Sequence, residues 1–295
     1  MGVALGLGAA LAWGLADYFA AVASRDLGAL RVVLGFHVAA LIPLTALVLA
    51  TDALDPVSGT QIATLVGVGA VGWVSYLAFY GALEIGPISV LSPVISGYAA
   101  VTVLLAVTVA GNHLSGLQGA AIGVTIAGAM VASADVREVA RAKLERRTAL
   151  GFLLALAAMA LLGGFVFGVS YYRAQIGWLA PIFLARGFAA GFVLGHVLVA
   201  GGRGEPAPDT ARAPGRNRRL AALIMLLALL DTGGYACFNL GAGHADTAIV
   251  AAASAPYAIV PIAMGVTLLG ERPTRAQWLG AGIVIAGVVM LGVVA

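Results

Sequence analysis

The chain has 295 residues, of which 61% are hydrophobic and 10% are charged, with a net charge of +3 and a mean hydropathy of +1.03. Because a soluble domain carries about 25% charged residues, this composition excludes a soluble globular enzyme, a disordered scaffold and a secreted disulfide-linked domain. About ten helices of ~20 apolar residues would use roughly 200–220 residues and leave short loops, which indicates a polytopic membrane protein without a separate soluble domain.

Polar, glycine or proline breaks divide the chain into apolar segments long enough to cross a bilayer as helices. The first segment lacks the positive flank of a signal peptide, so we expect it to be a retained span. The long polar stretch 135–147 is predicted to form a short surface helix between two halves, and 201–219 is predicted to be a flexible loop. The predicted spans are 3–23, 30–50, 61–83, 87–110, 116–134, 149–172, 179–200, 220–242, 247–269 and 275–294.

The two halves of the chain align with each other in colinear order. A shift of 149 residues aligns His37 with Arg186, and after the longer loop a shift of 159 aligns Tyr76 with Tyr235. An odd number of spans in each copy makes the second copy insert upside down, which gives an all-α inverted repeat of five plus five transmembrane helices. The predicted units are a five-helix repeat over 1–134, a basic linker over 135–148 and a second five-helix repeat over 149–295.

The basic residues indicate how the chain sits in the membrane. Fourteen of the 16 lysines and arginines fall in or beside loops on one side, the exceptions being Arg173 on the other side and Arg186 inside a span. The positive-inside rule makes this basic side cytoplasmic and both termini external. Because the basic residues alternate with apolar spans, we expect a multi-pass protein of the cell (inner) membrane and no nucleic-acid partner.

Four ionisable side chains lie inside predicted spans, namely Asp17, His37, Arg186 and Asp231. Such a group costs at least ~2.5–3.5 kcal/mol in a bilayer and normally faces a cavity or a partner; a buried ion pair is the alternative. Asp17 and Asp231 are the first candidates for proton or cation coupling. His37 is a third candidate because histidine titrates near neutral pH, with a hydrogen-bonded packing role as its alternative. Arg186 could hold a substrate carboxylate or neutralise a carboxylate of the protein.

Two predicted spans carry polar stripes, because residues four apart share a helix face. Asp231, Tyr235 and Asn239 form one stripe, and Tyr76, Tyr80 and Glu84 form its counterpart in the first repeat. Two facing stripes would line a cavity that has aromatic walls and a few polar groups, as small-molecule sites do. Aromatic residues at the lipid interface are the alternative, but they belong near span ends, and Tyr76 and Tyr235 lie well inside their spans.

The first span contributes an aromatic side chain beside a carboxylate. Trp13 and Asp17 share a helix face, with Tyr18 next to them, and this combination suits a cationic or amino group. The predicted substrate-binding residues are Trp13, Asp17, Tyr18, Tyr76, Tyr80, Arg186, Asp231, Tyr235, Asn239 and Tyr257.

Prolines mark predicted hinges in the fourth and ninth spans. Proline removes a backbone hydrogen bond and kinks a helix, and Pro93, Pro256 and Pro261 lie near Tyr98 and Tyr257 in the two repeats. The sequence contains no metal-ligand spacing, nucleophile–base motif or phosphate-binding loop. We therefore expect no metal, no cofactor and no enzymatic activity.

The stretches ALAWGLADYF at 10–19 and LGERPTRAQWLGAGIVIAGVVML at 269–291 resemble those of EamA-type ten-helix exporters of the drug/metabolite transporter superfamily. Arg186 matches an arginine common in the second span of each repeat of that family. In the first copy His37 replaces this arginine, and Asn112-His113 replace the expected Glu-Arg. These departures suggest that Glu271 and Arg272 are a structural, loop-capping pair.

The resemblance implies a secondary transporter, commonly one that exports amino acids, related metabolites or drugs, often in exchange for protons. It also implies cytoplasmic termini, opposite to the orientation that the charges predict. We expect an exporter of small metabolites such as amino acids that works by alternating access in the lipid bilayer as a monomer, with proton coupling. A cationic drug efflux pump is the nearest alternative, and an integral membrane enzyme or a passive channel are more distant ones.

Overall fold

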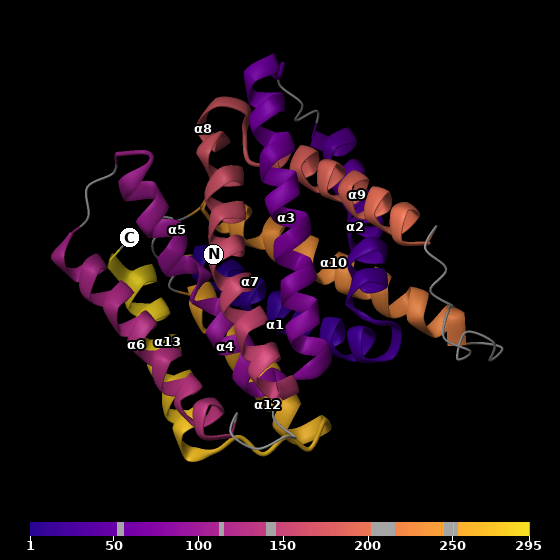
Figure 1. Ribbon diagram of the computed structural model, residues 1–295. Helices are drawn as coiled ribbons and strands as arrows, with labels where there is room; N and C mark the ends of the chain where they lie inside the picture. The colour runs from indigo at the N-terminus through magenta and orange to yellow at the C-terminus, as the bar shows by residue number, and fades with distance from the viewer. Residues whose placement is uncertain are drawn as a thin grey trace.

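The computed structural model describes residues 1–51, 56–111, 115–139, 146–201, 216–242 and 253–294, together with the single positions 244 and 250. Every regular element within these ranges is a helix (Figure 1). The first half contains α1 (Gly2–Leu27), α2 (Ala29–Thr51), α3 (Gly59–Ile85), α4 (Ile88–Ser96), α5 (Tyr98–Thr108) and α6 (Gly116–Val139). The second half contains α7 (Arg146–Tyr171), α8 (Arg173–Ile176), α9 (Leu179–Gly201), α10 (Arg216–Ala242), the 3₁₀ turn η2 (Ala255–Ala258), α12 (Ile259–Leu268) and α13 (Arg275–Val294).

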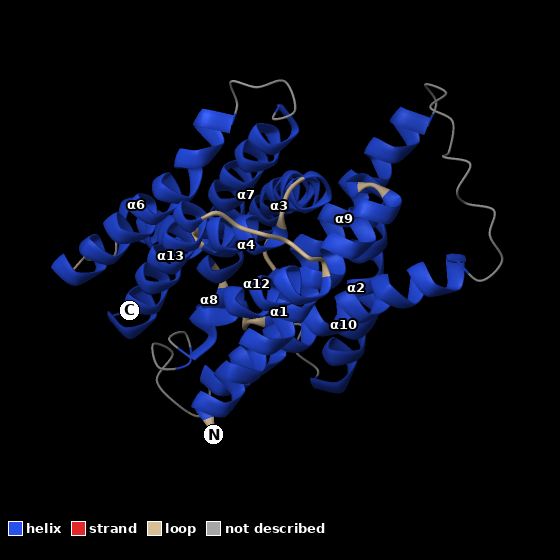
Figure 2. Cartoon of the chain, turned by 90° about the horizontal axis from the view of Figure 1, so that it is seen from below, coloured by secondary structure: helices blue, strands red, loops and turns tan. Residues whose placement is uncertain are grey.

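The helices of the described ranges form ten spans, with α4–α5 and η2–α12 each making one interrupted span. Seven apolar helical stretches in the described residues are long enough to cross a bilayer, and three shorter apolar helices accompany them. Both chain ends lie toward the same side of the molecule (Figure 2), as an even number of spans requires. The chain is therefore an all-helical polytopic membrane protein, as the composition predicts.

The polar stretches between the spans are only partly described. Helix α6 continues to Val139 and α7 begins at Arg146, so both ends of the predicted linker 135–148 extend the neighbouring spans. Its residues 140–145, most of the predicted loop 201–219, and Asn112-His113 lie outside the described residues. The short helix α8 is an element that the apolar pattern does not predict.

The packing follows the symmetry of an inverted repeat. Helix α1 packs against α10, and its counterpart α7 packs against α3, so the first span of each repeat contacts the third span of the other (Figure 1). In the same way, α2 contacts α10 while α9 contacts α3, and α6 pairs with α13. The core of the molecule is thus built between the repeats rather than within either one.

Equivalent glycines permit one of these inter-repeat contacts. A Cβ on Gly14 of α1 would come within 2.7 Å of the carbonyl oxygen of Tyr257, and a Cβ on Gly163 of α7 would come within 2.9 Å of that of Tyr98. Both tyrosines lie at the interruption of a broken span. The first helix of each repeat therefore packs directly on the interrupted backbone of the other repeat, as small residues allow in membranes.

The last helix of each repeat begins in the same way. Ser115 and Gln118 exchange side-chain hydrogen bonds with each other's backbone N–H at 3.2 and 2.9 Å at the start of α6. Thr274 and Gln277, 159 residues later, do the same at 3.3 and 2.9 Å at the start of α13. Each pair is a capping box that satisfies free N–H groups of the first helical turn, so the duplication extends to the local signals that begin a helix.

The interrupted spans break close to, but not at, their prolines. Pro93 lies inside α4 and is buried, and the break comes at Gly97 between α4 and α5. In the second repeat the break is the 3₁₀ turn η2, whose backbone includes Pro256. Pro261 occupies the first turn of α12, where a missing N–H leaves no helical bond unmade. The hinge role of the prolines stays a prediction.

Candidate functional site

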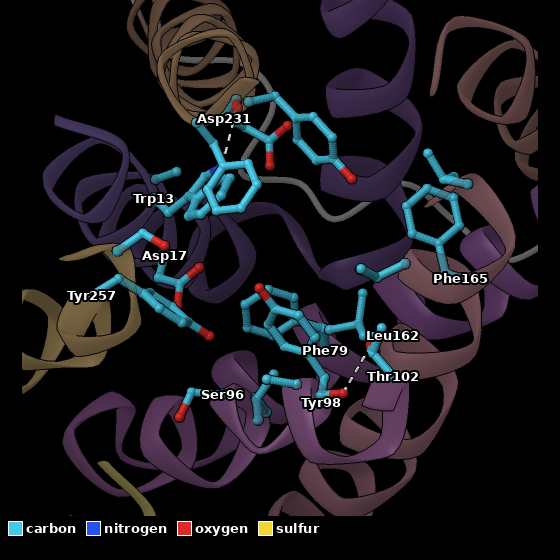
Figure 3. A pocket seen from close by; sticks show the side chains of 18 of the residues that line it. Trp13, Asp17, Phe79, Ser96, Tyr98, Thr102, Leu162, Phe165, Asp231 and Tyr257 are labelled. Atoms are coloured by element: carbon cyan, nitrogen blue, oxygen red, sulfur yellow. Dashed lines mark hydrogen bonds between the residues drawn. The ribbon is translucent and has the colours of Figure 1, made fainter. Parts of the chain in front are cut away.

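A cavity of about 480 Å³ lies between the two repeats in the middle of the helices. Figure 3 shows Trp13, Asp17 and Tyr257 on one wall and Thr102, Leu162 and Phe165 across from them. The lining extends through Asn239 of α10 to Arg173 of α8, so the cavity reaches from mid-membrane toward the end that carries α8.

Eight of the ten predicted substrate-binding residues line this cavity. They are Trp13, Asp17, Tyr76, Tyr80, Asp231, Tyr235, Asn239 and Tyr257. Tyr18 lies outside it, because consecutive residues of an α-helix point about 100° apart, and its ring packs against Phe19 with 5.4 Å between ring centroids. Arg186 also lies outside the lining, in the packed layer behind Tyr76 and Asp231.

Trp13 links its own helix α1, the first span of the first repeat, to α10, the third span of the second repeat. Its indole N–H donates to the backbone carbonyl of Asp231 at 3.3 Å, and its ring meets Tyr235 and Tyr257 edge-on at 6.0 and 6.5 Å between centroids. A Cβ on Gly234 would lie 2.5 Å from the indole nitrogen, so the glycine makes room for the ring. Edge-on aromatic contacts are favourable, and they give this wall a fixed shape.

Asp17 is a buried carboxylate at the inner end of the cavity. It is 8% exposed, and its Oδ2 accepts a hydrogen bond from the Ser92 hydroxyl of α4 at 3.3 Å. The two ion pairs formed among the described residues involve Asp231 and Glu271 instead. Within the described part of the chain, Asp17 therefore faces the cavity without a cationic partner.

Asp231, by contrast, is paired. Nη2 of Arg186 donates to Asp231 Oδ2 at 2.6 Å and to the Tyr76 hydroxyl at 3.1 Å. The guanidinium, 1% exposed, also lies over the rings of Phe36 and Tyr76, with its carbon 4.7 and 5.4 Å from their centroids. A charge buried this deeply requires a counter-charge. Arg186 thus neutralises a carboxylate of the protein, one of the two roles that the sequence leaves open for it.

His37 is packed among aromatic rings and does not line the cavity. Its side chain is fully buried, Nδ1 lies 2.9 Å from the carbonyl oxygen of Val33, and the ring meets Phe36 and Tyr76 edge-on. Nε2 has no hydrogen-bond partner among the described residues. This arrangement fits the packing role better than proton transfer through the cavity.

The cavity also contains polar residues that are not predicted from the sequence. Ser96 and Thr102 line it from the interrupted fourth span, and Ser92 supports Asp17 from the same span. Ser89, Ser92 and Ser96 are three and four residues apart, so the spacing rule that identifies the stripes on α3 and α10 could have found this one. Arg173 belongs to the unpredicted helix α8 and has no comparable signal.

Comparison with known proteins places these features in a family context. The EamA-like transporter family matches the chain over residues 1–134 and 149–293. None of the curated proteins compared with the chain matches it. Among 23 matching solved chains, one named "Crystal structure of protein" superposes with a TM-score of 0.59 over 100% of this chain and 98% of its own, at 18% sequence identity. A likeness at this identity supports the fold alone.

Proposed function

The chain belongs to the EamA-like transporter family and is a membrane transporter of the drug/metabolite type; we propose that it exports small metabolites bearing an amino group, by alternating access and in exchange for protons. One observation carries the proposal: the carboxylate of Asp17, which has no cationic partner among the described residues, faces an aromatic-walled cavity between the two repeats. By the charge rule the basic end is cytoplasmic, and we place the protein in the inner cell membrane. We also propose that it acts as a monomer.

The side chains around Asp17 favour a cationic head group. Trp13, Tyr98 and Tyr257 line the cavity together with Asp17, and the faces of aromatic rings attract cations within about 6 Å. Arg173 lines the cavity nearer its α8 end, where it could hold a substrate carboxylate. A deep carboxylate and a distant guanidinium in one cavity suit a zwitterion such as an amino acid.

Asp17 also offers a simple means of proton exchange. The carboxylate can hold either a proton or the ammonium group of a substrate, and both loaded forms are neutral. An empty, ionised Asp17 is costly to carry through a bilayer, which disfavours reorientation of the unloaded protein. Asp231 is less suited to this task, because Arg186 occupies it at 2.6 Å.

The proposal is tested by substrate counterflow in proteoliposomes that contain the purified protein. A panel of labelled amino acids, amines and carboxylic acids is compared with and without a proton gradient. We expect counterflow of amino compounds that a proton gradient accelerates, and loss of this acceleration in Asp17→Asn. Proton-driven transport that survives in Asp17→Asn would contradict the coupling role, and absence of counterflow for every amino compound would contradict the substrate class.

The alternative, a pump for cationic drugs, makes a different prediction at Arg173. A cation without a carboxylate gains nothing from a guanidinium in the cavity. Arg173→Gln should therefore raise the KM for amino acids and leave that for their decarboxylated amines unchanged if the zwitterion is the substrate. Improved transport of the amines alone would favour the cationic drug pump.

A further inference from the structure

Glu271 follows the first residue of α4 by 183 positions in the sequence, and its carboxylate caps the start of this helix. Oε1 accepts from the backbone N–H of Ile88 at 2.9 Å, and Oε2 accepts from the N–H and the hydroxyl of Ser89 at 2.9 and 2.7 Å. The first N–H groups of a helix have no partner within it, and the helix dipole favours an anion there. One side chain of the second repeat thus satisfies the first turn of α4 in the first repeat.

Arg25 of α1 completes the same cluster. Its Nη2 lies 3.0 Å from Glu271 Oε1 and donates to the carbonyl of Gly86 at 2.8 Å, and its Nε donates to the carbonyl of Leu83 at 3.1 Å. These carbonyls end α3, where a cation is favourable. We call Arg25, Glu271, Ile88 and Ser89 the clasp; it joins the ends of α1 and α3, the start of α4, and the loop between α12 and α13.

The surrounding backbone fixes the clasp carboxylate in place. The N–H of Glu271 donates to the carbonyl of Gly265 at 3.1 Å, which folds the loop back over the end of α12. A Cβ on Gly265 would come within 2.7 Å of Glu271 Oε2 and 2.8 Å of an Ile88 methyl carbon, so a larger residue would displace the carboxylate from this position. The Glu271 side chain is 9% exposed. The carboxylate of the clasp is therefore nearly buried and held by backbone groups, while Arg25, whose side chain is 30% exposed, covers it from the surface.

Helix α4 connects the clasp to the cavity. All nine of its residues are buried, and they carry Ser89 at the clasp, Ser92 on Asp17 and Ser96 in the cavity lining. Asp17 and Arg25 lie two turns apart on α1. Helices α1 and α4 are thus tied at two levels, once through Asp17 and once through the clasp, and a shift of α4 at either level is transmitted to the other.

From this arrangement we infer that the clasp is the gate at the basic end of the transporter, and that the occupant of Asp17 controls it through α4. The inference rests on the proposed alternating access. An ionised Asp17 accepts from Ser92 and holds α4 in place, with Glu271 capping the helix and the basic end closed. A proton or an ammonium group on Asp17 competes with Ser92 for the carboxylate, which frees α4 to move away from Glu271 and back, so that the basic end can open and close while Asp17 is occupied.

The gate is tested by thiol accessibility in vesicles of known sidedness. The native cysteine is removed by Cys237→Ala, and Ala99→Cys places a thiol in the cavity lining. A membrane-impermeant maleimide is applied from each side. Glu271→Gln keeps the size of the side chain and removes its charge. The matched control is Glu84→Gln, because Glu84 caps α2 through the N–H of Ala29 at 2.7 Å and makes no hydrogen bond or ion pair with the described residues of the clasp.

We expect Glu271→Gln to raise the labelling rate from the basic side by about tenfold, as loss of roughly one charge-assisted hydrogen bond from the closed state predicts. Labelling from the opposite side should fall, and Glu84→Gln should change neither rate. If Glu271→Gln folds poorly, the milder variant Ser89→Ala replaces it. Ser89→Ala removes one of the four bonds that Glu271 accepts and should shift both labelling rates in the same directions. Asp17→Asn combined with Glu271→Gln should be less than additive, because both act through α4.

Equal labelling in Glu271→Gln, Ser89→Ala and the parent protein would overturn the gate, as would an equal rise from both sides, which indicates general loosening. The assay needs no substrate. Its failure therefore leaves the proposed transport intact, whereas failure of counterflow leaves the labelling result standing.

Discussion

Replacing Asp231 by asparagine would leave Arg186 as a buried guanidinium without a counter-charge. Arg186 is 1% exposed, and its Nη2 lies 2.6 Å from Asp231 Oδ2. Removing one partner of a buried ion pair costs about 3–5 kcal/mol. We expect ~3 kcal/mol for Asp231→Asn, because the amide oxygen can still accept a hydrogen bond and the Tyr76 hydroxyl stays in place.

The thermal assay can use the native cysteine. Cys237 is the only cysteine of the chain and is partly buried in α10, so a thiol-reactive fluorophore reports unfolding in detergent without an added label. A loss of ~3 kcal/mol corresponds to a fall of roughly 6–12 °C in Tm. Asp17→Asn is the matched control; it removes a carboxylate without an ion-pair partner and should lower Tm much less.

A double variant separates charge from packing. Arg186→Met with Asp231→Leu removes both charges and keeps apolar bulk, and such replacements of buried pairs are often neutral or stabilising. We expect it to recover most of the lost stability. An unchanged Tm in Asp231→Asn, or a double variant no more stable than the single one, would refute this account of the pair.

Two further predictions concern the cavity wall and the buried histidine. Gly234→Ala places a Cβ 2.5 Å from the Trp13 indole nitrogen, so the indole ring must move. We expect a higher substrate KM and a shifted tryptophan emission. Wild-type values for both would contradict this. His37→Asn keeps a donor toward the carbonyl of Val33. We expect transport to retain its pH dependence and Tm to fall by a few degrees. Loss of the pH dependence would instead identify His37 as a coupling group.

The spans and the two polar stripes can be predicted because each depends on local spacing. An apolar run of about 20 residues already defines a membrane helix, and tyrosines or carboxylates four residues apart fall on one face wherever that helix packs. Tyr76, Tyr80, Asp231, Tyr235 and Asn239 therefore meet in one cavity, as their spacing predicts. The serines of α4 follow a similar spacing but are less conspicuous in an apolar segment than charged or aromatic residues.

Partnership between charges cannot be predicted in this way, because it depends on packing between distant segments. Arg186 and Asp231 are 45 residues apart in sequence, and Arg25 and Glu271 are 246 apart. The sequence supplies the four side chains but gives no rule for pairing them. Only the reach of the Arg186 side chain from α9 to α10 distinguishes Asp231, which it pairs, from Asp17, which has no cationic partner among the described residues.

The capping of α4 by Glu271 bears on the energy balance of the transport cycle. Identical inverted copies could exchange conformations and give two end states of equal free energy, but Asn112 occupies the position equivalent to Glu271. The carboxylate that accepts four bonds at the basic end thus has no carboxylate counterpart in the other copy. Closing the basic end should then release more free energy than closing the opposite end. An unloaded carrier with this bias would rest open toward the side that supplies the exchanged proton, which gives the cycle a preferred direction.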